Sequence, residues 1–396
     1  MKDISRFFTL YWIVYFPTCI AYNDLPGFSR IDELMTIILL VFTFFHYGKS
    51  SINGIPWKEF IVCLCIIAFY WAYSMLWGEN VSGAVWLDLM QEVRPYVIVF
   101  CTWILNPRFT RSQKRWMLAT MIITLISWIL YHPETLASQQ EAEFPVLGQL
   151  AICTGMTYYL FTKSTARNKW VALVIVMSGM LAPKFKFMGE AVCFVALIFF
   201  VRKQLNFHSP KTAIFVGLLM AAVLTVTWQR FDAYYVTGIN NEGLARPMTY
   251  KTAWKILGDY IPFGSGMGTF ACNGAWRYYS PLYYKYDLNG IWGLSESGGF
   301  ICDAYYPTLA QFGVVGVFFF LWFWKRRLIQ MDSIRDMKYW RIAFITFFCL
   351  AIEQTADSSW LSGKGMGYCM LLGLCLNQAS KQRLGRKARK ERLPRR

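Results

Sequence analysis

Long apolar runs alternate with short polar gaps along most of this chain. A membrane-spanning helix needs about 20 apolar residues, and shorter runs are accommodated by tilt or local bilayer thinning. This pattern predicts about twelve spans, which cover residues 7–23, 32–47, 59–77, 86–106, 116–131, 147–162, 169–182, 187–201, 213–229, 306–324, 341–356 and 365–378. The fold class expected is all-α, in a polytopic membrane protein.

One segment, residues 230–306, interrupts the apolar pattern. It mixes glycine, tyrosine, tryptophan and isolated charges without a sustained apolar face. Such a composition predicts a structured loop with short helices rather than a span or a disordered linker. The predicted organisation is therefore nine spans over residues 1–229, this loop, three spans over 307–378, and a basic tail over 379–396.

Composition agrees with this reading. The chain is 56% hydrophobic and only 16% charged, more apolar surface than an ordinary soluble core can bury. The eleven cysteines lie mostly inside apolar runs, and Cys272 and Cys302 are the only two in the large loop. The three histidines, His46, His132 and His208, show no metal-ligand spacing. We expect neither a metal site nor a cofactor.

The formal net charge of +17 indicates topology rather than a nucleic-acid partner. If the amino terminus is cytoplasmic, the Lys- and Arg-rich gaps all fall inside, with the nine basic residues between Lys381 and Arg396. The opposite short gaps are nearly free of Lys and Arg, one hairpin excepted, and one gap carries Glu134, Glu141 and Glu143. The positive-inside rule then places both termini in the cytoplasm and the 230–306 loop outside. Membrane lipid is the expected partner of the tail.

Ionisable residues inside or beside the spans are the first candidates for function, because such charges are costly and usually have a partner or a role. Asp88 and Glu92 share a face of the fourth span, and Arg94 lies roughly 12 Å along it from Trp86. Two interpretations stay open for Arg94: an internal ion pair with a carboxylate, or substrate binding.

Two further groups lie at outer gaps. Lys184 and Lys186 occupy a short hairpin that should lack basic residues, with Glu190 in the next span. Phosphate or pyrophosphate attraction is the preferred interpretation, and snorkelling toward lipid headgroups is the alternative. Glu353, Asp357 and Lys364 surround the last external gap, where we expect a hydrated turn rather than a loop closing over a site.

The large loop supplies the remaining candidates. Arg246 precedes a stretch with Trp254 that predicts a short helix ending near Gly258, followed by a tight turn rich in glycine. An arginine at a helix start suits an anion, although loop arginines more often form structural ion pairs. The loop also carries Arg277, Glu296 and Asp303. Its many tyrosines either stack on sugar rings or form an interfacial belt.

These residues carry a family resemblance. Arg246, Trp254, the PFGSGMGTF turn from Pro262 to Phe270, and ICDAYYPTLAQFGVVGVFFFL from Ile301 occur in an order that resembles the O-antigen polymerase and O-antigen ligase superfamily of bacterial inner-membrane proteins. The likeness in span count and in a single large periplasmic loop extends over most of the chain, and the motif match covers about residues 246–316.

Two departures bear on which member the chain resembles. In the ligase branch a histidine stands eleven positions before the glycine that closes the loop motif. Counting back from Gly313, that position is Cys302, with Asp303 beside it. This difference favours a polymerase of surface polysaccharide repeat units over a ligase. The family also tends to have an arginine at the mid-chain outer hairpin, where this chain has lysines that keep the charge but not the bidentate fork.

The resemblance implies inverting glycosyl transfer between two undecaprenyl-pyrophosphate-linked glycans, donor and acceptor, without nucleotide sugar or metal. A chain-length regulator protein is a further partner that it leaves open. Cationic side chains can stabilise a pyrophosphate leaving group; Arg246 and Arg94 are the first candidates, followed by Lys184, Lys186 and Arg277. Asp303, Glu296 and Glu190 are the candidate general bases. The leading competitor is a flippase or secondary transporter of a lipid-linked or anionic substrate.

Overall fold

The computed structural model describes residues 2–24, 30–49, 55–131, 145–181, 184–206, 209–238 and 241–392. Within these ranges the chain is helical, without a β-strand, so the all-α expectation is confirmed there. The acidic residues used above for topology, Glu134, Glu141 and Glu143, lie outside the described residues, as do His132 and His208.

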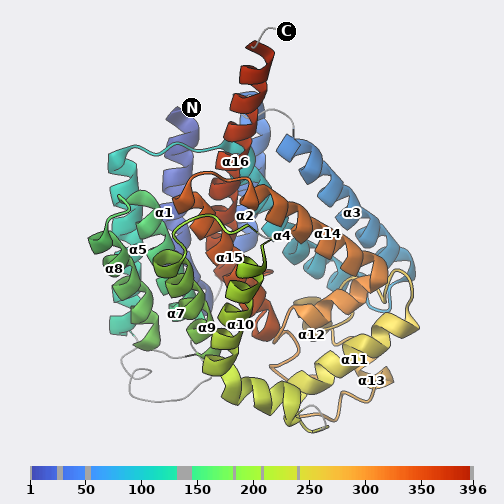
Figure 1. The fold of residues 1–396 in the computed structure, drawn as a ribbon. Helices are drawn as coiled ribbons and strands as arrows, with labels where there is room; N and C mark the ends of the chain where they lie inside the picture. The colour runs from blue at the N-terminus through green and yellow to red at the C-terminus, as the bar shows by residue number, and fades with distance from the viewer. Residues whose placement is uncertain are drawn as a thin grey trace.

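The body of the described chain is built from long helices that run roughly alongside one another (Figure 1). Each of the twelve predicted apolar segments overlaps one of them. They are α1 (Lys2–Asp24), α2 (Ile31–His46), α3 (Ile55–Trp77), α4 (Ser82–Leu105), α5 (Arg111–Tyr131), α7 (Pro145–Phe161), α8 (Ala166–Met177), α9 (Phe185–Val195), α10 (Pro210–Phe231), α14 (Gly313–Asp332), α15 (Met337–Ala356) and α16 (Met366–Arg392).

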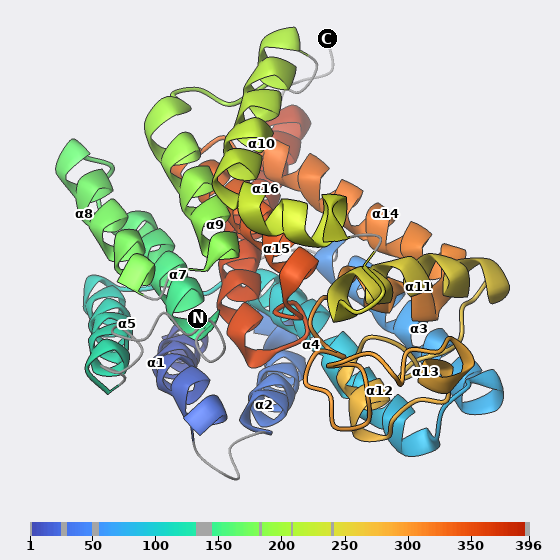
Figure 2. The ribbon, with the colours of Figure 1, turned by 90° about the horizontal axis from the view of Figure 1, so that it is seen from below.

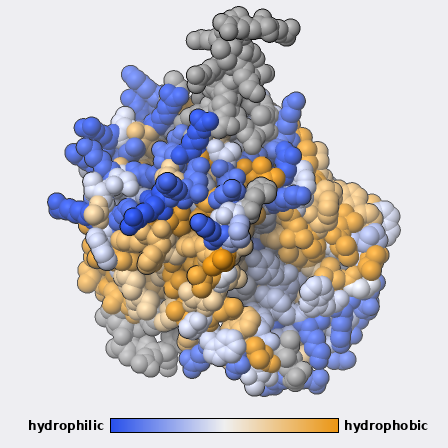
Figure 3. All heavy atoms as spheres, in the orientation of Figure 1, coloured by the Kyte–Doolittle hydropathy of each residue, from blue (hydrophilic) through white to orange (hydrophobic). Residues whose placement is uncertain are grey.

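Three helical stretches of the described chain are long and apolar enough to cross a membrane, namely Pro56–Trp77, Pro210–Val236 and Tyr306–Asp332. Large apolar side chains on them face outward, including Leu218, which is 66% exposed. Figure 3 shows the hydrophobic residues gathered in a broad band between two hydrophilic ends. Outward-facing apolar surface on this scale is typical of a helical membrane protein.

Helix α4 forms the centre of the body, and α2, α3 and α16 pack against it. Every residue of α4 from Val97 to Leu105 is buried. Gly373 of α16 allows the two helices to approach closely, because a Cβ at that position would lie 2.7 Å from the Val99 carbonyl oxygen. Small residues commonly allow such contacts between membrane helices, where packing replaces the hydrophobic effect as the attraction.

The 230–306 segment folds into a compact unit at the end of the body opposite the two termini (Figure 1). It contains α11 (Ala245–Asp259), α12 (Asn273–Arg277) and α13 (Leu282–Lys285). The view from below places these helices beside α3, α4 and α14 (Figure 2). Contacts of α12 with α4, and of α11 with the 3₁₀ turn η6 (Tyr306–Phe312), fix the unit to the body.

Candidate functional site

Charged side chains from separate segments meet where the compact 230–306 segment, which we call the loop unit, contacts the ends of the body helices. We call this group the outer charge cluster; its members are Lys184, Lys186, Arg246, Asp303, Asp357 and Lys364. They come from the α8–α9 hairpin, α11, the end of the large loop, and the connection between α15 and α16. Electrostatic interactions link Lys184 to Lys186, Asp357, Lys364 and Asp303.

Arg246 forms the loop side of the cluster. It is the second residue of α11, and its Nε and Nη2 lie 2.6 Å and 2.5 Å from Oδ2 of Asp303. The guanidinium also stacks over the ring of Tyr234, with its carbon 4.4 Å from the ring centroid. The two side chains are still 16% and 22% exposed. The sequence left two interpretations of Arg246 open, an anion site and a structural ion pair. The structure shows the ion pair, in a position that solvent and a ligand can reach.

Burial and charge act in opposite directions on this pair. Burial raises the pKa of Asp303 above its ordinary value, although Arg246 opposes the shift. Burial alone would lower the pKa of Arg246, but Asp303 and the nearby tyrosines outweigh it, so that the guanidinium stays charged. A carboxylate with a raised pKa beside a fixed cation has the properties of a general base.

Lys186 forms the helix side of the cluster. Its Nζ lies 2.7 Å from Oε2 of Glu353 and 2.5 Å from Oδ2 of Asp357. Asp357 also lies 3.8 Å from the Lys364 ammonium. Burial would raise the pKa of Asp357, yet the two lysines outweigh it and hold this pKa below the ordinary range. The carboxylate is therefore ionised and ties the α9 hairpin to the α15–α16 connection.

Lys184 is the cation of the cluster for which the described residues provide no carboxylate within ion-pair distance. It is half-buried. Burial lowers its pKa, and the charge of Lys186 lowers it further. Four cations therefore face three carboxylates, including Glu353. An anion bound beside Lys184 would relieve this crowding of positive charge.

The connection between α15 and α16 was expected to be a hydrated turn, and that expectation is wrong. Trp360 is 1% exposed and Leu361 is buried. Ser359 donates to Glu353 at 2.9 Å and accepts from Gln149 at 2.6 Å. The segment 357–365 therefore enters the helical body as a packed element, because its side chains find partners there that water would otherwise supply.

Glu190 lies deeper than the cluster, one helical turn after Lys186. It is fully buried, accepts from the Tyr368 hydroxyl at 3.1 Å, and lies next to Glu353. A general base must reach the proton that it removes. The burial of Glu190 within α9 makes it a less suitable base than Asp303, which is partly exposed.

Arg94 lies apart from the outer charge cluster. Its guanidinium pairs with Asp32 at 2.7 Å and with Glu33 at 3.2 Å, and it donates to the carbonyl oxygen of Leu361. The internal ion pair was one of the two interpretations above, and here the partners come from α2 rather than from Asp88 or Glu92. Two carboxylates already occupy Arg94, which is 1% exposed, and this position suits a structural role.

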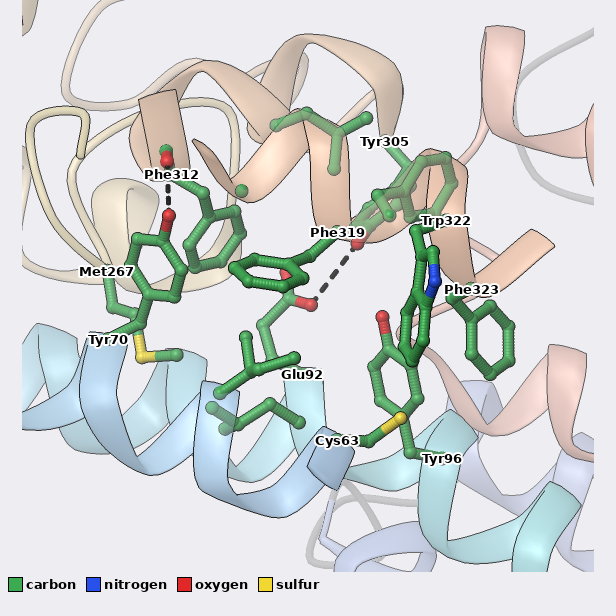
Figure 4. A pocket seen from close by; sticks show the side chains of 15 residues that line it. Cys63, Tyr70, Glu92, Tyr96, Met267, Tyr305, Phe312, Phe319, Trp322 and Phe323 are labelled. Atoms are coloured by element: carbon green, nitrogen blue, oxygen red, sulfur yellow. Dashed lines mark hydrogen bonds between the residues drawn. The ribbon is translucent and has the colours of Figure 1, made fainter. Parts of the chain in front are cut away.

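Asp88 and Glu92 each hold a part of the loop unit instead. Asp88 accepts from the backbone N–H of Gly268 at 3.0 Å and from the Gln311 amide at 2.7 Å. Glu92 accepts from the Tyr305 hydroxyl at 3.2 Å (Figure 4). These contacts connect α4 with the loop unit on both sides of Asp303.

The glycine-rich turn and the end of the loop, two of the stretches that carry the family resemblance, contact each other. The Gly266 N–H donates to the Gln311 carbonyl at 2.9 Å. Gly268 has φ +76°, and a Cβ there would lie 2.7 Å from the backbone of Ala84. A side chain would be excluded on both counts. The turn therefore supports the end of the loop, the segment that contains Gln311 and, eight residues earlier, Asp303.

Glu296 and Arg277 lie on the exposed surface of the loop unit. Glu296 accepts a hydrogen bond from the Tyr284 hydroxyl, and Arg277 ends α12. Neither forms an ion pair with the outer charge cluster among the described residues. Of the eight residues proposed from sequence, the structure thus brings together Arg246, Asp303, Lys184 and Lys186. Cys272 and Cys302 are both free thiols.

Sequence reasoning missed the tyrosines that position Arg246. Tyr235, which precedes α11, and Tyr250, which lies within it, both donate to the Thr355 carbonyl at 2.9 Å and attach the chain on both sides of Arg246 to α15. Tyr234 supplies the ring beneath the guanidinium. An aromatic pair directly after a span is commonly an interfacial anchor, so nothing in the sequence distinguished these residues from an interfacial belt.

No protein-family model matches the chain, and no curated protein sequence matches it either.

Proposed function

We propose that this protein is a glycosyltransferase that polymerises undecaprenyl-pyrophosphate-linked oligosaccharide repeat units into a surface polysaccharide. The observation that carries the proposal is the outer charge cluster, in which Lys184 forms no ion pair with a described residue and lies near the Arg246–Asp303 pair. A pyrophosphate leaving group needs positive charge as its bond to the sugar breaks. A sugar hydroxyl that attacks needs a base. The cluster offers both within one partly exposed site.

In this proposal Lys184 and Arg246 face the pyrophosphate of the donor. Lys186 anchors the segment that carries Lys184 through its ion pairs with Glu353 and Asp357. Asp303 accepts the proton of the acceptor hydroxyl, which attacks the anomeric carbon and displaces the lipid pyrophosphate with inversion. The reaction is proposed to proceed without a metal ion, because the cations of the chain stabilise the departing charge.

The proposal includes a topology. All twelve body helices cross the bacterial inner membrane, with both termini in the cytoplasm and the loop unit in the periplasm. Three features support it: the placement of Lys and Arg, the hydrophobic band (Figure 3), and the position of both termini at the end opposite α11–α13 (Figure 1). An even number of crossings brings the two termini to one side.

A transporter of lipid-linked glycan is the second candidate. The observation that favours it is the pair of buried carboxylates Glu190 and Glu353, which lie next to Lys186 and continue from the cluster into the helical body. Charged residues at such depth often mark a transport path. An O-antigen ligase is a further alternative within the enzyme class, and it would require a lipid A-core acceptor.

Reconstituted vesicles distinguish an enzyme from a transporter. The purified protein is supplied with fluorescent lipid-linked repeat unit and EDTA, and both donor consumption and donor flipping are followed. The proposal predicts consumption with release of lipid pyrophosphate, lost in Lys184→Met and retained in Lys255→Met, an exposed lysine of α11. Intact donor that crosses the bilayer without being consumed would refute the proposal that the protein is an enzyme.

A further inference from the structure

The body contains an apolar groove next to the loop unit, between α3, α4 and α14. The empty space in and over it amounts to about 550 Å³, its open side included. Figure 4 shows Phe319 of α14 beside Glu92, whose hydrogen bond with Tyr305 lies between Tyr70 on one side of the groove and Tyr96 on the other. Most of its wall is aliphatic or aromatic, including Ile66 and Ile67 of α3. A lining of this kind takes an apolar ligand.

The groove lies between two helices that belong to membrane-crossing stretches, Pro56–Trp77 and Tyr306–Asp332. Phe318 and Leu321 of α14 are each 61% exposed, and their neighbours Phe319 and Trp322 are half-buried and line the groove. The groove therefore reaches the surface in the hydrophobic band, where membrane lipid replaces water. An apolar chain can enter it sideways without passing through water.

Polar contacts close the seam between α3 and α14 on both sides of the groove. At one end the Tyr70 hydroxyl donates to the Phe312 carbonyl at 2.8 Å. At the other, Glu59 pairs with Arg327 and, at 2.5 Å, with Arg326. The open part runs along α3 from Cys63 to Tyr70, about 10 Å at the helical rise. This length suits part of one long chain rather than a globular ligand.

Tyr305 connects the groove with the outer charge cluster. Its hydroxyl donates to Glu92 at the groove wall, and its backbone N–H donates to the Gln354 carbonyl at 3.1 Å, next to Glu353. It stands two residues after Asp303. None of the described residues that line the groove is basic, so none of them would offset the charge of a phosphate. A ligand with an apolar tail and a phosphorylated head would therefore place its head toward the cluster.

We infer that the α3–α14 groove binds the isoprenoid chain of the lipid-linked substrate. The inference rests on the proposed function, and it adds a binding site that the loop motifs do not indicate. Part of the methyl-branched chain packs against the aromatic lining of the groove, and the contacts that Tyr305 makes with Glu92 and Gln354 lead from there toward Lys184 and Arg246. The groove thus selects the lipid carrier, and the cluster acts on the head group.

A photoreactive isoprenyl pyrophosphate without sugar tests this inference on the full-length protein in nanodiscs. Labelled peptides are mapped by mass spectrometry. We expect label on α3 and α14 around the groove. In Ile66→Trp, which fills the groove, labelling should fall at least about tenfold, equivalent to the loss of 1.4 kcal/mol in binding. Val62→Trp is the control, since Val62 is 43% exposed on the same helix and does not line the groove.

If Ile66→Trp does not give folded protein, Phe319→Trp decides, because that side chain already lines the groove (Figure 4). Label outside the groove, unchanged labelling in the filled variant, or equal labelling by a photoreactive diacyl phospholipid would overturn the inference. The probe carries no sugar, so labelling does not depend on glycosyl transfer. Turnover without labelling of the groove would refute only the inference that the groove binds the isoprenoid chain. Labelling of the groove without turnover would refute the proposal that the protein is a glycosyltransferase.

Discussion

At the scale of residues, the behaviour of the candidate site depends on how Asp303 and Arg246 share a partly buried position. Arg246 holds Asp303 through two nitrogen atoms that contact the same oxygen, Oδ2. The described residues form no hydrogen bond with Oδ1, which can therefore accept one from a substrate hydroxyl. Lysine at position 246 would keep the charge but would lose this two-nitrogen contact and the stacking on Tyr234.

The pH dependence of turnover tests the role of Asp303. Burial raises its pKa above the ordinary aspartate value of about 4. A general base works only when it is deprotonated, so turnover should decline as the pH falls through this raised pKa. We expect an acidic limb above the ordinary aspartate range in the profile of kcat. Asp303→Asn should reduce turnover at least about a hundredfold and remove that limb; a variant that keeps both rate and limb would exclude Asp303 as the base.

Individual site residues could be predicted from the sequence to the extent that charge placement is unusual. Lys184 and Lys186 occupy a gap that the positive-inside rule leaves without basic residues, and they were selected for that reason. Their partners could not be predicted, because Lys186 and Asp357 lie 171 positions apart. Arg94 shows the same limit, since its partners Asp32 and Glu33 open a different helix.

At the scale of elements, the segment 357–365 is the part that differs most from expectation. Its sequence contains serines, glycines and charges, which usually indicate a solvated turn. It is buried because Lys186 and Gln149 supply partners from other helices. Local composition carries no information about such tertiary partners, whereas α11 was predicted closely because its boundaries depend on local signals.

The ion pair between Lys186 and Asp357 should contribute to stability. The cations hold the pKa of Asp357 below its ordinary value, so the pair stabilises the fold above the ordinary aspartate pKa and loses this contribution as the pH falls through the lowered value. At neutral pH, Lys186→Met leaves two carboxylates facing each other and should cost about 3 kcal/mol. Thermal unfolding in detergent measures this. Lys364→Met is the control, because its contact with Asp357 is 3.8 Å long; an equal loss in both variants would contradict the assignment.

The glycine-rich turn provides a second test at this scale. Ala in place of Gly268 would adopt a positive φ and place its Cβ against the backbone of Ala84. The substitution should destabilise the loop unit by about 1–3 kcal/mol and speed proteolysis of residues 241–306. Gly290→Ala should change neither, since no atom lies within 4 Å of a Cβ there. Similar proteolysis of the two variants would argue against the close packing of the turn.

At the scale of the whole molecule, the two termini lie opposite the loop unit (Figure 1). A protease site inserted between Asn289 and Gly290, both exposed, tests the proposed sidedness. In spheroplasts with intact inner membranes we expect cleavage at this site by added protease, while a carboxy-terminal tag stays protected. In inverted vesicles the tag should be digested and the loop spared. Cleavage of loop and tag from the same side would contradict the topology.

The helical body could largely be predicted from the sequence, because the length and polarity of each apolar run are local properties that a bilayer selects. The arrangement of the helices around α4 could not, since it depends on contacts such as that of Gly373 with Val99. The same holds for the meeting of α9, α11 and the α15–α16 connection that forms the cluster. The apolar runs supply the framework, and packing between distant segments creates the site.

The most direct test of the central claim is a glycan ladder formed by the purified protein. Wild-type protein in nanodiscs receives the lipid-pyrophosphate repeat unit of its own host with EDTA, and products are separated on gels and identified by mass spectrometry. We expect a ladder of lengthening glycans on the lipid carrier, absent with Arg246→Ala and present with Lys255→Ala. A wild-type protein that forms no ladder and leaves the donor unchanged, or an Arg246→Ala variant that forms a normal ladder, would contradict the account.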